Sequence, residues 1–264
     1  MIRKFSIACC LVATLAVAAQ KPTEKQPTGP LKDGMGRDYW VYLPKRVEAA
    51  KTYWLVVGVH GMGGTGQGAG GFANFATKRD DCIVLGPTFP SDGYQFLQKD
   101  SDRQLLDLIA TLAQRHRLHP KVFVTGFSGG AQFAHRFAHA YPDKVVGYAA
   151  HSAGSWSTGQ GWGDINPATR TVPAIITCGM TDTGKMAAQV PFGRLEWAQA
   201  YVQQLASRGH AHFAVWIPKM GHQLSPEAIK LTEVGLEVAI GSSRATGADA
   251  VKLRDSLKKA QAAR

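Results

Sequence analysis

Short apolar runs alternate along the chain with longer segments in which apolar residues recur every three or four positions. The runs have the length of buried strands, and the segments between them have the period of amphipathic helices. Strands that alternate with helices predict the α/β class, with a mostly parallel central sheet and helices on both faces. The expected strands are residues 39–43, 53–59, 82–85, 121–125, 145–150, 174–178 and 212–217. The expected helices are residues 72–78, 101–117, 130–139, 192–207, 226–240 and 246–261.

The segment GFSGG, residues 126–130, joins an expected strand directly to an expected helix. A Gly-x-Ser-x-Gly turn in this place bends sharply, so that the serine hydroxyl projects at the carboxyl end of the sheet. A serine hydroxyl is a weak nucleophile unless a base lies within hydrogen-bond reach. The five-residue pattern alone is common, but its position after a strand and before a helix predicts that Ser128 is a nucleophile.

A base and an acid for Ser128 are expected at the same edge of the sheet. His222 stands in a Gly-His turn after the last expected strand, which makes it the predicted general base. Asp182 follows an expected strand by a few residues, whereas Asp143 lies at the opposite edge and Asp164 lies in a loop. Asp182 is therefore the predicted carboxylate that orients the base, and the order serine, aspartate, histidine fits this arrangement.

The loop HGMGG, residues 60–64, follows a buried strand and is a candidate for half of an oxyanion hole. The predicted donors are the backbone N–H groups of Met62 and Gly129, with Gly61 as the alternative to Met62. Nucleotide binding is disfavoured, because the loop lacks the Gly-Lys-Ser/Thr end of a phosphate-binding loop. The next strand also lacks the terminal acidic residue of a dinucleotide site.

The segments HGMGG, GFSGGAQFAHRFAHAYPDKVVGYAAHSAG, CGMTDT and MGH occur in this order. Together they resemble the α/β-hydrolase superfamily. More narrowly, they are similar to the secreted esterases grouped with polyhydroxybutyrate depolymerase and feruloyl esterase, and to dienelactone-hydrolase-like esterases. The resemblance covers about residues 39–240. It implies the α/β-hydrolase fold and hydrolysis of carboxylic esters through an acyl-enzyme, with no metal or organic cofactor.

The resemblance also suggests which residues border the substrate pocket. His60 and Gly61 belong to the oxyanion loop, and His151, Ser152 and Trp156 follow the nucleophile helix. One departure stands out, because those depolymerases often carry cysteine pairs and an appended binding module, and this chain shows neither. The expected partner is a small-molecule or polymer-attached ester, and the sequence leaves the acyl group, the alcohol and the oligomeric state open.

Two other functions stay open beside ester hydrolysis. The same residues would serve a small serine peptidase of the prolyl-oligopeptidase type, although no propeller or specificity domain precedes the catalytic part. A non-catalytic binding protein on a hydrolase scaffold is the third possibility. Such proteins commonly lose one member of the catalytic triad, and all three members are present here.

The first nineteen residues have the pattern of a secretory signal peptide. Arg3 and Lys4 are its positive region, residues 7–19 are apolar but too short to span a bilayer, and cleavage is predicted after Ala18 or Ala19. A retained anchor is the alternative. We expect a secreted or periplasmic protein without stable membrane insertion. The expected divisions are a signal peptide at 1–19, a flexible lead-in at 20–36, the catalytic domain at 37–242 and a basic tail or helix at 243–264.

The formal net charge is +11, and it falls by two to +9 if Arg3 and Lys4 leave with the signal. A positive surplus favours anionic surfaces, but no basic stripe with interleaved aromatic residues is present, so nucleic acid is not an expected partner. Cys82 opens one expected strand and Cys178 closes another. These are opposite ends of a parallel sheet, so we expect two buried free thiols rather than a disulfide.

Overall fold

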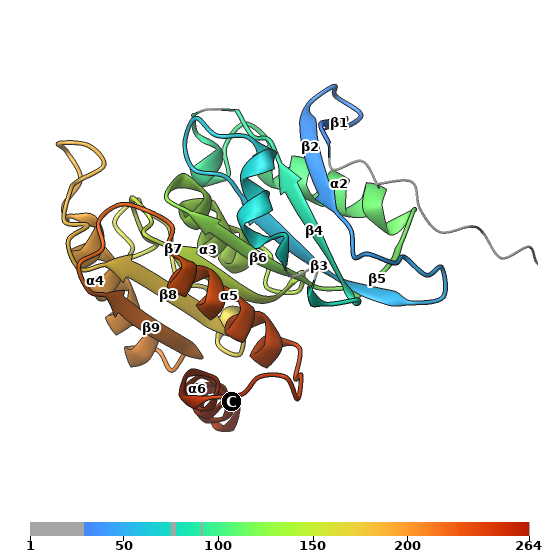
Figure 1. Ribbon diagram of the computed structural model, residues 1–264. Helices are drawn as coiled ribbons and strands as arrows, with labels where there is room; N and C mark the ends of the chain where they lie inside the picture. The colour runs from blue at the N-terminus through green and yellow to red at the C-terminus, as the bar shows by residue number, and fades with distance from the viewer. Residues whose placement is uncertain (1–28, 75–77, 91, 264) are drawn as a thin grey trace, which may run out of the picture.

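The computed structural model describes residues 29–74, 78–90 and 92–263 (Figure 1). The predicted signal peptide and the first part of the predicted lead-in lie outside these residues. The described strands are β1 (Leu31–Lys32), β2 (Asp38–Tyr42), β3 (Thr52–Val59), β4 (Cys82–Pro87), β5 (Arg117–Leu118), β6 (Val122–Phe127), β7 (Val145–His151), β8 (Ala174–Gly179) and β9 (His212–Ile217). The described α-helices are α2 (Ser101–Ala113), α3 (Gly129–Ala140), α4 (Arg194–Ser207), α5 (Pro226–Ala239) and α6 (Ala248–Ala262). Three short 3-10 helices are η1 (Gly66–Phe72), η2 (Tyr94–Phe96) and η3 (Pro167–Thr169).

Within the described residues the strands form one sheet in the order β1-β2-β4-β3-β6-β7-β8-β9, and β5 pairs with β3. The pairs that involve β1 and β2 are antiparallel, and the pairs from β4 through β9 are parallel. The prediction of a mostly parallel central sheet is therefore confirmed. In this arrangement the carboxyl ends of β3, β6 and β8 lie at one edge, which is where the loops of interest begin.

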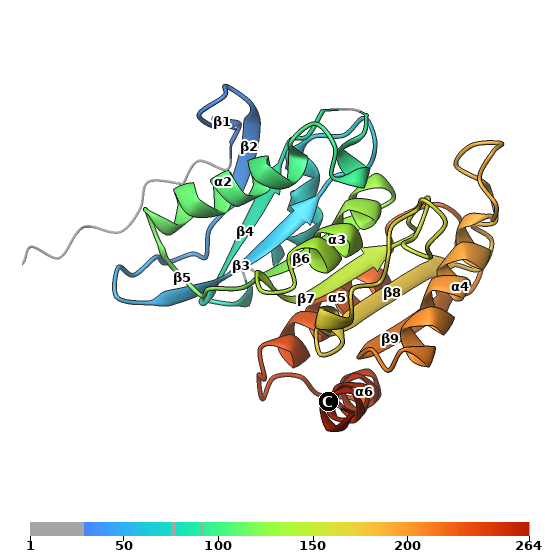
Figure 2. The same ribbon diagram turned by 180° about the vertical axis from the view of Figure 1, so that it is seen from behind.

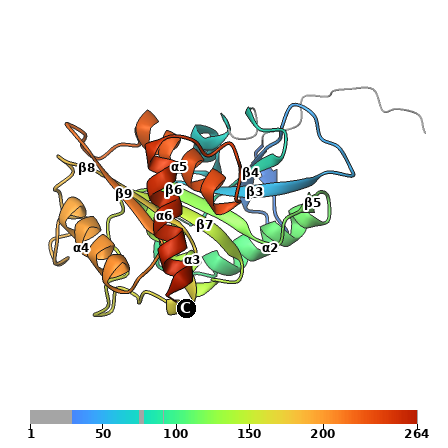
Figure 3. The ribbon, with the colours of Figure 1, turned by 90° about the horizontal axis from the view of Figure 1, so that it is seen from below.

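Helices cover both faces of the sheet, as the sequence predicted. Alternate residues of one strand enter different cores, because successive side chains of a strand point to opposite faces. In β3, Leu55 and Val57 belong to the core under α2, α3 and α4, while Val56 belongs to the core under η1, α5 and α6. The view from behind has α2, α3 and α4 in front of the strands (Figure 2). The view from below has α5 on one side of the sheet and α2 and α3 on the other (Figure 3).

Two segments differ from the sequence-based picture: residues 31–32, and residues 114–118, where the helix expected at 101–117 ends at Ala113 and Arg117 begins β5. Leu31 and Lys32, expected in a flexible lead-in, form β1 and pair with β2. The Lys32 ammonium forms an ion pair with the Asp38 carboxylate at 2.6 Å. The Asp33 carboxylate accepts hydrogen bonds from the backbone N–H groups of Met35 and Arg37, so local polar contacts close this hairpin. The predicted helix at 72–78 lies partly outside the described residues. The two-residue strands β1 and β5 are too short to leave a pattern in the sequence.

The expected basic segment at the carboxyl end contains the helix α6. Its residues Ala250, Leu253 and Ala260 are buried, and the helix packs against α5 and β9. Two contacts fasten it to β9. The Ser256 hydroxyl accepts the backbone N–H of His212 at 2.9 Å, and the Lys252 ammonium lies 5.7 Å from the centre of the Phe213 ring. Of the two forms expected for this segment, a tail or a helix, the structure has the helix.

The two described cysteines are free and buried, as predicted. Cys82 lies at the amino end of β4 and Cys178 near the carboxyl end of β8. They also belong to different cores, on opposite faces of the sheet. Burial raises the pKa of each thiol to about 12, so both stay protonated near neutral pH.

The first turn of α3 lies unusually close to the sheet, which leads to a testable prediction. A Cβ on Gly130 would lie 2.1 Å from the carbonyl oxygen of Val59. We therefore expect Gly130→Ala to lower the free energy of unfolding by about 2 kcal/mol or more, because the backbone must shift to admit the methyl group. Chemical denaturation measures this difference. Gly34→Ala is the matched control, since a Cβ there meets nothing within 4 Å, and an equal loss in both variants would contradict the packing argument.

Candidate active site

Ser128 sits at the turn between β6 and α3, with a backbone φ of 56° and ψ of −115°. A positive φ is uncommon for a residue with a side chain and is a strained conformation. The turn around it is tight, since a Cβ on Gly126 would lie 2.4 Å from the carbonyl carbon of Gly130, so only glycine admits this approach of α3 to β6. The turn therefore presents a half-buried serine side chain at the carboxyl edge of the sheet, beyond β6.

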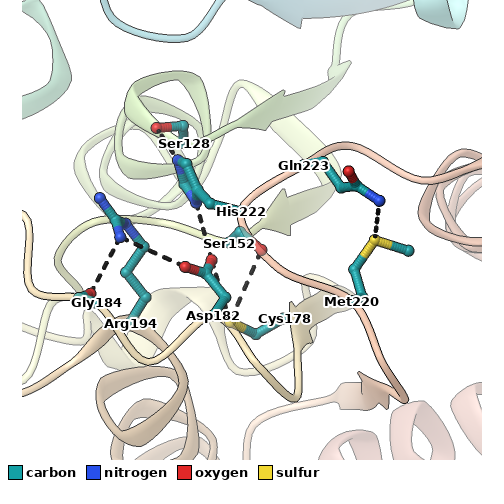
Figure 4. Close-up of polar contacts among 9 residues, drawn as sticks. All are labelled: Ser128, Ser152, Cys178, Asp182, Gly184, Arg194, Met220, His222 and Gln223. Atoms are coloured by element: carbon teal, nitrogen blue, oxygen red, sulfur yellow. Dashed lines mark hydrogen bonds and ion pairs between the residues drawn. The ribbon is translucent and has the colours of Figure 1, made fainter.

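His222 lies in the loop between β9 and α5, and its ring reaches Ser128 (Figure 4). The distance from Nε2 to the Ser128 Oγ is 3.0 Å. The loop is held against the end of β8, because the Thr181 N–H donates to the Met220 carbonyl at 2.9 Å. A Cβ on Gly179 would lie 2.2 Å from that carbonyl oxygen, so only glycine permits this approach. The Phe127 ring, 4.8 Å from the His222 ring between centres, covers part of the imidazole.

Asp182, just beyond β8, accepts a hydrogen bond from His222. Its Oδ2 lies 2.8 Å from the His222 Nδ1. A carboxylate only accepts, so Nδ1 carries the proton and Nε2 is left to accept the proton of the Ser128 hydroxyl. The structure therefore brings the three residues predicted as nucleophile, base and acid into one hydrogen-bonded chain.

Arg194, the first residue of α4, is the second partner of Asp182. Its Nη1 lies 3.4 Å from the Asp182 Oδ1 and donates to the Gly184 carbonyl at 3.1 Å (Figure 4). Burial alone would raise the pKa of Asp182. The hydrogen bond from His222, the charge of Arg194 and the Ser152 hydroxyl outweigh burial and lower that pKa below its ordinary value of 3.8. Asp182 is thus a carboxylate throughout the neutral range.

The oxyanion loop lies beside the first turn of α3. A Cβ on Gly129 would be 3.1 Å from the Met62 nitrogen, so the two backbone nitrogens predicted as donors are neighbours. The Met62 side chain is 58% exposed. A Cβ on Gly61 would lie 3.7 Å from the Ser128 Cβ, which places this loop directly over the serine.

His60 and Tyr94 hold the oxyanion loop in place. The buried His60 ring accepts the Phe89 N–H at Nε2, 3.0 Å away, so Nδ1 carries the proton and donates to the Gly61 carbonyl at 2.7 Å. Burial lowers the pKa of His60, which keeps the ring neutral. The Tyr94 hydroxyl donates to the His60 carbonyl at 2.8 Å. His60 and Gly61 also line a hollow of about 220 Å³ beside Phe127.

Three of the predicted pocket residues do not border open space. His151 is buried. Its two ring nitrogens are hydrogen-bonded to the hydroxyls of Thr177 and Thr232, at 2.8 and 2.7 Å. Trp156 is fully buried, and its ring stacks against both the His135 ring and the Tyr201 ring. Both belong to the core, and the expectation that they line the pocket is corrected.

Ser152, the third of these residues, is buried behind the acid. Its hydroxyl lies 3.7 Å from the Cys178 Sγ, and it contributes to the lowered pKa of Asp182. Its backbone φ is 50°, a second strained position close to Ser128. Ser152 therefore supports the acid and does not face a substrate.

Two residues of this site were not predicted from the sequence, Tyr94 and Arg194. Tyr94 lies in the short helix η2 and Arg194 at the start of α4, far from any motif. Arg194 stands twelve positions after Asp182, and no periodic pattern singles it out. Only the return of α4 to the edge of the sheet brings its guanidinium to the carboxylate.

Among the described residues, no group of three or more His, Cys, Asp or Glu side chains could hold a metal ion. In the same part of the chain, no helix combines the length and apolarity needed to cross a membrane.

No protein-family model and no curated protein matches the sequence. Solved structures do match. A thermostable esterase is 19% identical with a TM-score of 0.60, and the match covers 81% of this chain and 62% of that chain. A ferulic acid esterase from Anaeromyces mucronatus is 18% identical with a TM-score of 0.59, covering 82% and 90%. A poly(3-hydroxybutyrate) depolymerase from Bordetella parapertussis is 17% identical with a TM-score of 0.59, covering 86% and 93%.

The chain has the α/β-hydrolase fold. At these identities the likeness concerns the fold, and the predicted fold class is confirmed. The chain spans 62% of the length of the thermostable esterase, less than two thirds of it, but at least 90% of the length of the other two proteins.

The Arg194 contact predicts an effect on the reactivity of this site. Arg194→Met removes a charge-assisted contact that orients the Asp182 carboxylate. We expect the rate constant for covalent modification of Ser128 by a serine-reactive fluorophosphonate to fall about three- to tenfold, because a loss of about 1 kcal/mol is several-fold in rate. The time course of labelling measures this. Arg208→Met, at the other end of α4, removes the same charge without touching the site, and an equal fall in both variants would rule out a local effect.

The same substitution predicts a pH dependence of stability. A carboxylate whose pKa is lowered on folding stabilises the native state above its unfolded pKa, and this contribution is lost as the pH falls through the lowered pKa. Arg194→Met raises the pKa of Asp182, so the variant loses part of that contribution. We expect the difference in unfolding free energy from wild type to be present at about pH 7 and to shrink as the pH falls below about 4 and through the lowered pKa of Asp182. A difference that grew towards acid pH in denaturation experiments would contradict the ion pair.

Proposed function

We propose that this protein is a serine esterase that cleaves carboxylic esters through an acyl-enzyme intermediate. The observation that carries the proposal is the hydrogen-bonded chain from the Ser128 Oγ through His222 to the Asp182 carboxylate, with distances of 3.0 and 2.8 Å. Both distances lie within the reach required of a nucleophile, a base and the group that orients the base.

In the proposed acylation step, the Ser128 Oγ attacks the ester carbonyl carbon while its proton moves to the His222 Nε2. The carbonyl oxygen becomes negatively charged, and the N–H groups of Met62 and Gly129 stabilise it. Asp182 keeps the imidazole in the required tautomer and stabilises its positive charge. The tetrahedral intermediate then breaks its bond to the alcohol oxygen, which takes the proton from Nε2, and the acyl group stays on Ser128.

Deacylation repeats these steps with water. His222, neutral again, accepts a proton from the water as the water oxygen attacks the acyl carbon. The second tetrahedral intermediate returns the Ser128 oxygen as leaving group, and that oxygen regains its proton from Nε2. The carboxylic acid is released, and no external oxidant, reductant or cofactor enters the balance.

The named structural neighbours support an ester as substrate, since they are an esterase, a ferulic acid esterase and a poly(3-hydroxybutyrate) depolymerase. The site of this chain is open, because Ser128 is half-buried and His222 exposed. The hollow beside it, about 220 Å³, is smaller than a typical pocket for a drug-sized ligand. These features favour a short acyl group, on a small molecule or attached to a polymer that stays outside the site.

A location outside the cytoplasm, secreted or periplasmic, is also part of this proposal. It rests on the signal-like pattern of the first nineteen residues, which lie outside the described part of the chain. Mass spectrometry of the protein exported by its native host tests it, since a mature amino terminus after Ala18 or Ala19 is expected.

The proposed nucleophile is tested by covalent labelling. We expect a fluorophosphonate probe to modify the wild-type protein at Ser128, because only a serine activated by a base reacts with it. Ser128→Ala should abolish labelling and lower kcat/KM for a p-nitrophenyl ester by at least about 10⁴-fold. Ser207→Ala, an exposed serine on α4, is the matched control and should label and react as wild type does.

The substrate class is decided by a panel of p-nitrophenyl esters of increasing acyl length, a feruloyl ester and peptide anilides. The short acyl esters should react fastest. Faster cleavage of the peptide anilides than of the esters would show that the protein is a peptidase and not an esterase. If the wild-type protein is neither labelled nor active on any of these substrates, the esterase proposal is wrong. A non-catalytic binding protein with this fold is then the remaining function.

A further inference from the structure

A second cavity, of about 640 Å³, lies along the side of α3. Its walls are the end of η2 and the residues after it, the carboxyl half of α3, and the loop that includes residues 161–167. Its volume is in the range of pockets that hold small organic ligands. None of Ser128, Asp182 and His222 lines it. Arg136 does line this cavity. It follows Ser128 by eight positions, which is a rise of about 12 Å along the axis of α3.

Arg136 is the feature that distinguishes this cavity. Its side chain is buried, and its described hydrogen bonds go to neutral oxygens only: the Gln132 carbonyl at 3.1 Å, the Ser155 hydroxyl at 3.0 Å and the Trp162 carbonyl at 3.1 Å. A guanidinium has five N–H donors, so these contacts leave two donors unused. Among the described residues no carboxylate pairs with it, and the acidic residue of the cavity wall, Asp164, is exposed.

The positive charge of Arg136 is therefore buried without a negative partner. Burial lowers the pKa of this guanidinium to about 9, which reflects how unfavourable its surroundings are for a charge. The Phe96 ring lies under it, 4.7 Å from the guanidinium carbon to the ring centre, and provides a partial compensation. An anion would compensate the charge better, because opposite charges attract more strongly beside a buried group than in bulk water.

The wall of the cavity leaves the guanidinium accessible. Gly163 has a φ of +96°, and a Cβ placed on it would come within 4.0 Å of the Arg136 Nε. Gly161, with a φ of +86°, would have a Cβ with nothing within 4 Å. Gly163 adds no side chain of its own beside Nε, where the nearest side chain is Ser157, whose hydroxyl would lie 3.0 Å from a Cβ on Gly163. Since Arg136 itself lines the cavity, an anionic group of a ligand approaches the guanidinium from the cavity side.

The remaining walls include polar side chains such as Gln98 and Asn166, but their larger part is apolar. Phe96 and Trp162 face the cavity with ring centres 6.3 Å apart, and Leu97 and Ile165 add aliphatic surface. From these contacts we infer that the cavity binds a small monocarboxylate with an aromatic or other apolar body, its carboxylate on Arg136 and its body against Phe96 and Trp162. This site is separate from the proposed esterase site and does not depend on it.

Calorimetric titration with benzoate tests this inference, with benzamide as the neutral molecule of the same shape and with ionic strength held constant. We expect benzoate to bind one site per chain and benzamide to bind at least about tenfold more weakly, because hydrogen bonds between charged groups are the stronger ones. Equal binding of the two molecules, or no binding of benzoate by the wild-type protein, overturns the inference.

Two variants locate the site. Arg136→Met should weaken benzoate binding at least about tenfold. Because Arg136 is buried and its replacement can disturb folding, Ala140→Trp is the second variant, which fills the cavity from an exposed position at the end of α3 and leaves Arg136 in place. It should also weaken benzoate binding at least about tenfold and leave hydrolysis of a p-nitrophenyl ester unchanged. Wild-type benzoate affinity in a folded Ala140→Trp protein shows that benzoate binds elsewhere and overturns the assignment.

Discussion

The candidate active site depends on the close approach of α3 to the carboxyl ends of β3 and β6. Gly126 and Gly130 permit this approach, because a Cβ on either would lie within 2.4 Å of facing backbone. In the turn between them Ser128 has a φ of 56°, a conformation that costs about 1–3 kcal/mol. The strain is sustained because β6 and α3 are buried along almost their whole length. The same approach sets Gly129 beside the Met62 nitrogen, so one packing constraint positions both the nucleophile and the oxyanion donors.

A second constraint is electrostatic and concerns Asp182. A carboxylate with 3% exposure would be unstable as an isolated charge. His222 and Arg194 occupy its two oxygens, one each, and Ser152 adds a hydroxyl. These groups come from three different connections after β7, β8 and β9, which meet only because the strands are parallel. The sheet thus positions the acid and also supplies the groups that keep it ionised.

Features that depend on strand order could be predicted from the sequence. Ser128, Asp182 and His222 could be assigned to one edge because each follows a parallel strand, and chain order then suggested their roles. Burial could not be predicted in the same way. Trp156 follows the strand β7 and resembles a pocket residue, yet packing against α4 turns its ring into the core. Tyr94 and Arg194 had no signal, because their contacts arise between segments far apart in sequence. A two-residue strand such as β1 forms because it pairs with β2, and it is too short to show the alternation of apolar and polar residues that identifies a strand.

The helix α3 links the candidate active site to the second cavity. Most of its side chains are buried, including several polar ones. His135 and His139 stay neutral, because burial lowers the pKa of both, to about 3 for His139, and each ring has hydrogen-bond partners. Arg136 differs, because its neutral hydrogen-bond acceptors satisfy N–H donors of the guanidinium but do not neutralise its positive charge. An apolar side chain of similar volume would fill the same place without the desolvation penalty. The charge therefore contributes little to folding at this position. A negative group that enters the cavity removes the penalty, and a neutral molecule of the same shape does not.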